Sequence, residues 1–246
     1  MSKIIELKGI IKKITSRHLN LKYTIFDKLC LSIEPNSINI IKGASGVGKT
    51  TLLKIMSLLD DEFEGEVVIN GIDMAKKADG VKSKFIRENI GFIFQDYLLI
   101  PELTIKENVM LPLQLLKEKK CGEKAEKILC EVGVMDTLES SKGGFLNKYP
   151  YELSGGQQQR VAVARSLVSN SQIIFCDEPT GNLDIENKKM VVDCLVNWCR
   201  NDTHKSKTLI VVTHDNPSFF ERSATSIFEL RRENVNSPSK IFTTKT

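Results

Sequence analysis

The 246-residue sequence lacks the features that mark several common classes of protein. Its formal net charge is only +4, so no charge excess points to nucleic acid or to an anionic membrane surface. No apolar run approaches the roughly 18 residues that a membrane-spanning helix needs. The N-terminal apolar stretch is also too short for a signal peptide. We therefore expect a chain that does not bind nucleic acid and that reaches a membrane only through a partner.

The six cysteines do not form a recognisable pattern. No pair has the C-x-x-C spacing, and no histidine stands beside them at the spacing of a metal site. We expect reduced thiols in an intracellular protein, most of them buried.

Strand and helix signals alternate along much of the chain, which predicts an α/β fold. Strands are expected over residues 4–14, over residues 26–33 as part of an antiparallel hairpin, over residues 37–42, and over residues 66–74 with an Asn-Gly turn inside. Near the C-terminus we expect helix 155–168, strand 172–176, helix 186–200 and strand 208–213. This order predicts a parallel sheet with helices on both faces.

The middle of the chain, residues 97–151, has a helical character instead. Thr104 and Glu107 form a capping box before an apolar segment that Pro112 should kink or end. Residues 123–133 read as an amphipathic helix closed by a glycine. The polar tail from Asn234 is expected to be loose.

The stretch GASGVGKT matches the phosphate-binding pattern G-x-x-x-x-G-K-[ST] between a predicted strand and a predicted helix. Its glycines let backbone N–H groups turn inward around an anion, and the helix dipole adds to the attraction. Lys49 would reach the terminal phosphates and Thr50 would ligate Mg²⁺. The residues expected to bind the nucleotide here are Gly43, Ala44, Ser45, Gly46, Val47, Gly48, Lys49, Thr50 and Thr51.

Polar side chains follow three apolar runs that read as buried strands. Asp177 and Glu178 end the first, where Asp177 could hold Mg²⁺ and Glu178 could accept a proton from a water attacking a phosphate. Gln95 ends the second and could ligate Mg²⁺ or position water. His214 follows the third, at a position that suits either a ligand contact or a structural role. Taken alone, the two acids could simply cap the following turn.

A second helix start also suits an anion. Ser154 and Gln157 form a capping box, while Gly155 and Gly156 leave the first turn bare of side chains. Local evidence is equally compatible with a well-capped helix that binds nothing.

Together these motifs resemble the ATP-binding subunit of ABC transporters over residues 4–231. Walker A at 43–50, the Q-loop Gln95, the signature LSGGQQQR at 153–160, Walker B through Asp177, the D-loop GNLD at 181–184 and the H-loop His214 occur in that family's order. Longer matches around residues 94–113 and 151–167 resemble the branch of lipoprotein-release, macrolide-efflux and cell-division ATPases.

The resemblance implies an ATPase that uses Mg²⁺ and dimerises head to tail around two ATP molecules. The catalytic residues would be Lys49, Glu178 and His214, with Thr50, Gln95 and Asp177 on the metal. Other residues of this chain would contact the nucleotide that is bound to the second copy. These residues are Ser154, Gly155, Gly156, Gln157 and Asp184. A transmembrane permease would dock near Gln95 and the apolar segment 97–103, although that segment could also be core. The complex would place this chain on the cytoplasmic face of the inner or plasma membrane.

The resemblance also implies a P-loop NTPase (RecA-like) core with an N-terminal antiparallel β-subdomain and an inserted helical subdomain. Residues 1–246 would form one ABC ATPase domain, with 1–96 and 156–232 as β-subdomain and core, 97–155 as the helical subdomain and 233–246 as the loose tail. Members of this family usually stack an aromatic side chain on adenine. In this sequence Ile14 occupies the corresponding position, so His18 or Tyr23 could take over the stacking.

Two alternatives belong to other classes of protein. A soluble ABC ATPase acting on DNA or ribosomes would need a long coiled coil or a second cassette, and neither pattern is present. A non-catalytic regulatory subunit would not need Glu178, His214 and a complete signature.

Overall fold

The computed structural model describes residues 3–15, 22–134, 144–181, 183–200, 206–214, 218–234 and 237–245. The chain divides into two compact units. The first comprises Met1–Ile86 and Ile210–Thr246, and the second comprises Arg87–Leu209. None of the helices in the described ranges combines the length and the apolar character needed to cross a bilayer.

Four strands of the first unit form an antiparallel sheet in the order β2-β1-β4-β5. Asn70 and Gly71 have φ angles of 50° and 78°, and Ile69 pairs with Ile72 across this turn. Both residues are in the left-handed region that tight two-residue hairpins require. The predicted antiparallel pairing and the Asn-Gly turn are therefore confirmed. The strands are β1 (Ile5–Thr15), β2 (Lys22–Ile33), β4 (Glu64–Ile69) and β5 (Ile72–Asp73).

The first unit also holds β3 (Ile38–Lys42), which lies between β9 (Ser226–Arg231) and β8 (Thr208–Thr213), and most of β8 belongs to this unit. β3 pairs with β9 in parallel, and its residues are buried except Lys42. This confirms the buried strand that the apolar run predicted. The helices of this unit are α1 (Lys49–Met56), most of α2 (Asp79–Asn89) and α8 (Ser218–Glu221).

The tail that we expected to be loose contains an ordered strand, β10 (Lys240–Lys245), so that expectation was wrong. β10 pairs antiparallel with β9, with Ile241 opposite Leu230. Before it, Ser239 is buried and its N–H donates to the Ile25 carbonyl at 2.7 Å. The pairing satisfies backbone groups that a loose polar tail would leave to water.

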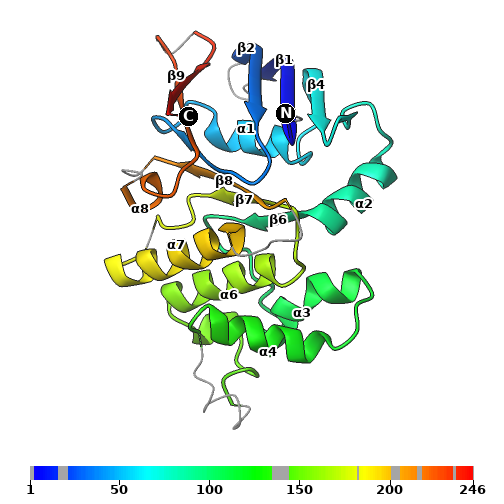
Figure 1. Ribbon diagram of the computed structural model, residues 1–246, viewed down its shortest axis with the longest axis vertical. Helices are drawn as coiled ribbons and strands as arrows, with labels where there is room; N and C mark the ends of the chain where they lie inside the picture. The colour runs from blue at the N-terminus through cyan, green and yellow to red at the C-terminus, as the bar shows by residue number, and fades with distance from the viewer. Residues whose placement is uncertain are drawn as a thin grey trace. The chain divides into compact units, whose positions relative to one another are not determined.

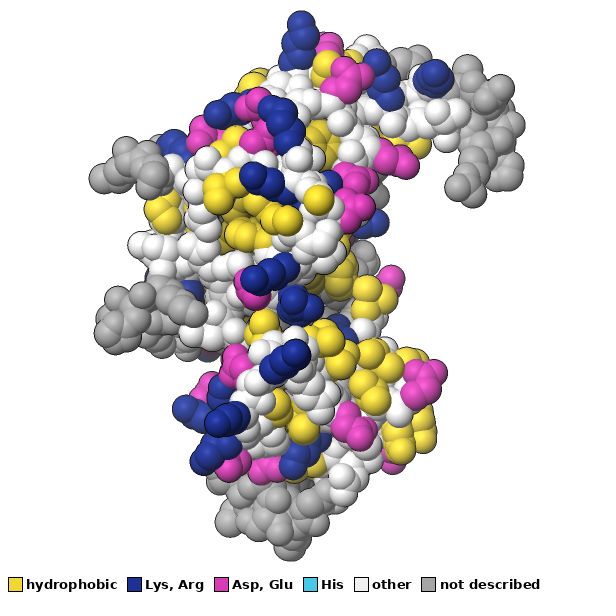
Figure 2. Space-filling view, turned by 90° about the vertical axis from the view of Figure 1, so that its right-hand side faces the viewer, with side chains coloured by type: hydrophobic (Ala, Val, Ile, Leu, Met, Phe, Trp, Pro, Cys, Tyr) yellow, Lys and Arg dark blue, Asp and Glu magenta, His cyan; other side chains and the backbone are white. Residues whose placement is uncertain are grey.

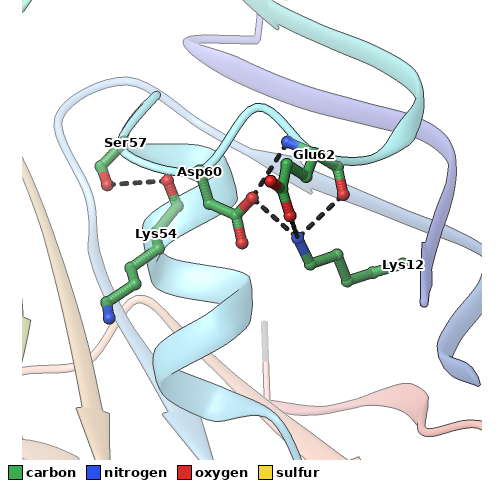
Figure 3. A network of polar contacts seen from close by, with 5 residues as sticks. All are labelled: Lys12, Lys54, Ser57, Asp60 and Glu62. Carbon is green, nitrogen blue, oxygen red and sulfur yellow. Dashed lines mark hydrogen bonds and ion pairs between the residues drawn. The ribbon is translucent and has the colours of Figure 1, made fainter. Parts of the chain in front are cut away.

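A buried cation fixes the loop that follows α1 (Figure 3). Lys12 of β1 is only 4% exposed, and its Nζ donates to Asp60 Oδ1 and to the Glu62 carbonyl, both at 2.8 Å. Glu62 N–H donates to the same Asp60 oxygen at 3.0 Å. Because a buried ammonium is costly unless it is paired, this network holds the end of α1 against β1.

In the second unit a helical layer packs on two parallel strands, β6 (Ile90–Ile93) and β7 (Ile173–Asp177). Figure 1 shows α3, α4 and α6 (green) side by side, as their mutual contacts require. A Cβ atom on Gly91 of β6 would lie 2.6 Å from Ser166 Oγ, so α6 lies directly against this strand. The helices are α3 (Ile105–Leu115), α4 (Cys121–Glu131), the 3₁₀ turn η1 (Pro150–Glu152), α6 (Gly155–Leu167) and α7 (Ile185–Arg200).

The helix-start and helix-end signals of this unit are mostly confirmed. Thr104 N–H donates to Glu107 Oε2 at 2.8 Å, and Glu107 N–H donates to Thr104 Oγ1 at 3.3 Å, which completes the predicted capping box. Gly133 follows α4 with a φ angle of 66°. Pro112 does not end α3, which continues to Leu115.

Candidate functional site

The loop between β3 and α1 in the first unit is shaped as a cradle for an anion. Gly46 and Gly48 have φ angles of 75° and 102°, which side chains avoid. A Cβ atom on Gly48 would lie 2.8 Å from Cγ2 of Ile25. α1 begins with no side-chain cap and no acidic residue in its first turn. Its N–H groups and its dipole are therefore available to a phosphate.

Lys49 carries the cation of this cradle. It is 7% exposed, and its Nζ donates to the carbonyls of Gly43 at 2.9 Å and Ala44 at 3.1 Å. The ammonium thus lies within the curve of the loop, among the groups expected to bind a nucleotide. The neighbouring Thr50 is exposed at the start of α1.

The C-terminal strands contribute to the surroundings of this loop, a contribution that the sequence did not reveal. Residues of β9 and the segment after it line a cavity of about 570 Å³ together with the loop residues Ala44, Ser45, Gly46 and Val47. Ser239 Oγ donates to the Val47 carbonyl at 2.7 Å, in a buried position. These side chains belong to no motif. The run IFTT at residues 241–244, made of β-branched and aromatic residues, was a sequence signal for an ordered strand here.

The residues considered for stacking on a base lie on the β1–β2 pair. Ile14 is directly opposite Tyr23, and both side chains are exposed. Either could meet a planar base, and His18 is outside the described residues. His214 is exposed immediately after β8, at the strand end where the sequence placed it.

The predicted acids and glutamine share one edge of the second unit's sheet. Ile93 of β6 pairs with Cys176 of the parallel β7. Gln95 and Asp177 follow these two residues closely, so the strand ends bring them to the same edge. Gln95 is exposed, whereas Asp177 is 8% exposed.

Glu178 has an unusual backbone conformation for a glutamate. Its φ angle is 52°, its side chain is 8% exposed, and its carbonyl accepts from Gly181 N–H at 3.2 Å. Strained non-glycine residues cluster at active sites, although this chain also has them in turns such as those at Lys117 and Asn170. Cys176, two residues before Glu178, is fully buried, and burial together with the Asp177 charge raises the pKa of its thiol. The carboxylates of Asp177 and Glu178 thus lie at the end of a fully buried strand.

The signature segment starts α6 as a capped and accessible helix. Ser154 N–H donates to Gln157 Oε1 at 3.0 Å, and Gln157 N–H donates to Ser154 Oγ at 3.3 Å. The predicted capping box is therefore present. Ser154 and Gly155 are exposed, and Gly156 is half-buried. A Cβ atom on Gly155 would lie 3.3 Å from the Tyr97 hydroxyl oxygen.

Arg165, further along α6, binds the turn that follows Gln95. Its Nη1 donates to the Leu98 carbonyl at 2.6 Å and its Nη2 donates to the Tyr97 carbonyl at 2.8 Å. Tyr97 and Leu98 have φ angles of 60° and 46°, so the guanidinium holds two successive left-handed residues. Burial lowers the pKa of Arg165. Sequence reasoning missed this residue because its partners are backbone atoms of a distant segment.

Asp184 immediately precedes α7, and its carboxylate accepts two hydrogen bonds from Asn187. The backbone N–H of Asn187 donates to Oδ1 at 2.8 Å, and its side-chain amide donates to Oδ2 at 2.6 Å. These two hydrogen bonds lower the pKa of the Asp184 carboxyl. Of the D-loop, Asn182 is outside the described residues.

Comparisons with known proteins show the family to which this chain belongs. Residues 26–181 match the family described as ABC transporter. The chain is 41% identical to the lipoprotein-releasing system ATP-binding protein LolD of Aquifex aeolicus, over 78% of this chain and 82% of that protein. It is 39% identical to the macrolide export ATP-binding/permease protein MacB of Bdellovibrio bacteriovorus, over 86% of this chain and 30% of that longer protein.

A solved structure has the same fold. It is a dimeric structure of a post-hydrolysis state of the ATP-binding cassette MJ0796 bound to ADP and Pi. The TM-score is 0.81 at 34% sequence identity, covering 92% of this chain and 94% of that one. The predicted α/β fold, with a P-loop core, is confirmed.

Proposed function

Because this chain belongs to the ABC transporter family as an ATP-binding subunit, we propose that it dimerises around two ATP molecules and drives a membrane partner. The partner would be of the lipoprotein-release, macrolide-efflux or mechanotransmission type. The observation that carries the proposal is the phosphate loop, with buried Lys49 inside a turn that only glycines allow. The dimeric MJ0796 structure with ADP and Pi supports the same assembly.

Each residue set has a distinct part in the reaction. The loop from Gly43 to Thr51 and Lys49 would hold the phosphates of one nucleotide, and His214 would contact the terminal phosphate. Glu178 would orient the attacking water and accept its proton, a role that suits a carboxylate fixed at a strand end.

The residues present also suit Mg²⁺. A threonine hydroxyl, an aspartate carboxylate and a glutamine amide oxygen are the hard oxygen donors that this ion prefers. Thr50, Asp177 and Gln95 would hold it, and the bound ion would neutralise charge on the phosphates.

The second copy would complete the site. The exposed start of α6, with Ser154, Gly155, Gly156 and Gln157, presents N–H groups and a helix dipole suited to a terminal phosphate on another chain. Asp184 would contact the second copy at the same interface. ATP would then join the two copies, and hydrolysis would release them.

The segment YLLIPEL at residues 97–103 would receive the permease. None of its residues is buried and Leu98 is 54% exposed, which argues against the core alternative. Figure 2 shows hydrophobic side chains gathered at the surface of the part of the molecule that contains α3 and α4. Exposed apolar surface of this kind is typical of docking sites. Docking would hold residues 1–246 on the cytoplasmic face of the inner or plasma membrane as one ABC ATPase domain, with 97–155 as its helical subdomain.

Mixing two inactive variants tests the shared site. Lys49→Ala removes the cation of the cradle, and Gly155→Asp places a carboxylate where the other copy's phosphate would bind. Asp is favourable in the first turn of a helix, so the second variant should fold. Each variant alone should hydrolyse almost no ATP. A one-to-one mixture should recover up to about a quarter of the wild-type rate, because half of random dimers are mixed and each holds one intact site.

Phosphate release from the mixture, compared with each variant at the same total concentration, is the measurement. A mixture no more active than its components would overturn the proposal that the nucleotide is shared between chains.

A further inference from the structure

One side chain in the first turn of α7 contacts both the D-loop and the signature helix. In the proposed function, these two segments face the second copy across the dimer interface. Asn187 donates to Asp184 Oδ2 at 2.6 Å through its side-chain amide. Its Oδ1 accepts from Nη1 of Arg160, a residue of the signature helix α6. Asn187 therefore joins the D-loop acid to the signature helix within one chain.

The amide suits this position better than any charged group. It must donate to a carboxylate and accept from a guanidinium at the same time, and an amide has one donor group and one acceptor group. These two partners fix which end is oxygen and which is nitrogen. A carboxylate at this position would still accept from Arg160 but would repel Asp184.

The fit against the signature motif is equally close. A Cβ atom on Gly156 would lie 3.0 Å from Cγ of Asn187, 3.1 Å from Nδ2 and 3.2 Å from Oδ1. The second glycine of the motif thus gives the Asn187 amide room to lie against the backbone of α6. Arg160 reaches over the same side chain, and its guanidinium is partly desolvated.

We propose that Asn187 is a positioning residue that holds the D-loop and the start of the signature helix as one rigid group. The inference rests on the proposed function, since it concerns the groups that face the second copy's nucleotide. Asn187 lies in the second unit, whereas the phosphate loop belongs entirely to the first. Its loss should therefore impair the dimer-dependent step and spare nucleotide binding by the single chain.

The test compares Asn187→Asp with Asn197→Asp, the same substitution at an exposed position of the same helix. Three quantities are measured for each: ATP affinity of the chain, the ATPase rate over a range of protein concentrations, and the unfolding temperature. For Asn187→Asp we expect an ATP affinity within about twofold of wild type and a maximal rate lower by about 10-fold to 100-fold, the size of effect that a small misplacement of reacting groups produces. Asn197→Asp should match wild type in ATP affinity and ATPase rate, and its unfolding temperature should fall only slightly, because a carboxylate in the last turn of a helix opposes the helix dipole.

A double-mutant cycle with Arg160→Met and Asn187→Leu adds a second readout. If the two side chains act as a unit, the double variant should be no slower than the slower single variant. Additive losses in rate would overturn the link to the signature helix.

The outcomes separate the two proposals. A wild-type rate per chain that does not depend on concentration would overturn the shared-site proposal and this inference with it. A concentration-dependent wild type with an unaffected Asn187→Asp would overturn this inference alone. So would an Asn187→Asp variant whose ATP affinity falls in proportion to its rate.

Discussion

At the scale of single residues, Glu178 is the group whose chemistry is most easily isolated. Replacing it by glutamine keeps the size of the side chain and removes the proton acceptor. We expect Glu178→Gln to bind ATP, to lose about 10²-fold to 10⁴-fold in turnover, and to accumulate as ATP-bound dimers. Phosphate release and analytical ultracentrifugation with ATP provide the measurements.

Glu123→Gln is a suitable control for that variant. Glu123 pairs with Lys120 on the surface at 3.2 Å, and both side chains are 72% exposed, so the pair contributes little. Normal hydrolysis by Glu178→Gln would remove the proton-acceptor role from this residue.

Gly48 gives a prediction about backbone conformation. An alanine there would combine a φ angle of 102° with a contact of 2.8 Å to Ile25, so Gly48→Ala should lose about 1–3 kcal/mol of unfolding free energy together with ATP binding. Gly80→Ala is the matched change, because a Cβ atom there meets nothing within 4 Å in helix α2. It should raise stability by up to about 1 kcal/mol. Urea unfolding without nucleotide would show both effects, and equal stability of the two variants would contradict the argument.

Residues differ in how far their roles could be predicted from sequence. Lys49 and Ser154 belong to motifs whose spacing carries a physical mechanism, so the sequence identified them. Arg165, Asn187 and Ser239 act through contacts with backbone or side chains far away in the chain. No local pattern encodes such contacts, and only the folded structure reveals them.

At the scale of elements, Arg165 connects the signature helix to the expected docking segment. Arg165→Met would leave the Tyr97 and Leu98 carbonyls without their donor and should cost about 1–3 kcal/mol of stability. We expect its ATP affinity to stay near wild type and its ATPase rate to fall, because the last turn of α6 would no longer hold the turn after Gln95 beside the signature helix. Arg165→Lys should be intermediate, since an ammonium lacks the fork that reaches two carbonyls.

Calorimetric nucleotide titration, ATPase assays and thermal unfolding would test this element, with the exposed Arg222→Met as the control. A rate for Arg165→Met equal to that of the control would rule out a link through α6.

Elements were predictable where one signal dominated. The capping boxes of α3 and α6 set their starts, and the apolar run of residues 173–176 defined β7. β10 was missed because its pairing with β9 and the anchoring of Ser239 compensate for a polar sequence. Pro112 did not end α3, because a proline lowers helix stability without determining where tertiary packing ends a helix.

At the scale of the whole molecule, the proposed dimer makes activity depend on concentration. The rate per chain should rise with protein concentration and then reach a plateau as dimers saturate. Initial rates over a wide concentration range would check this with wild-type protein. A rate per chain that stays constant across that range would contradict a site built from two copies.

The rate at which the buried Cys176 is alkylated should report how often the strand β7 opens transiently. Alkylating reagents need an exposed thiolate, so they should modify this sulfur only in the rare moments when β7 leaves its sheet. ATP binding should lengthen the half-life of the unmodified thiol, while the exposed Cys30 should react at the same speed with or without nucleotide. Mass spectrometry of the two peptides would then measure how strongly a ligand protects the strand that carries Asp177, with no label or substitution introduced.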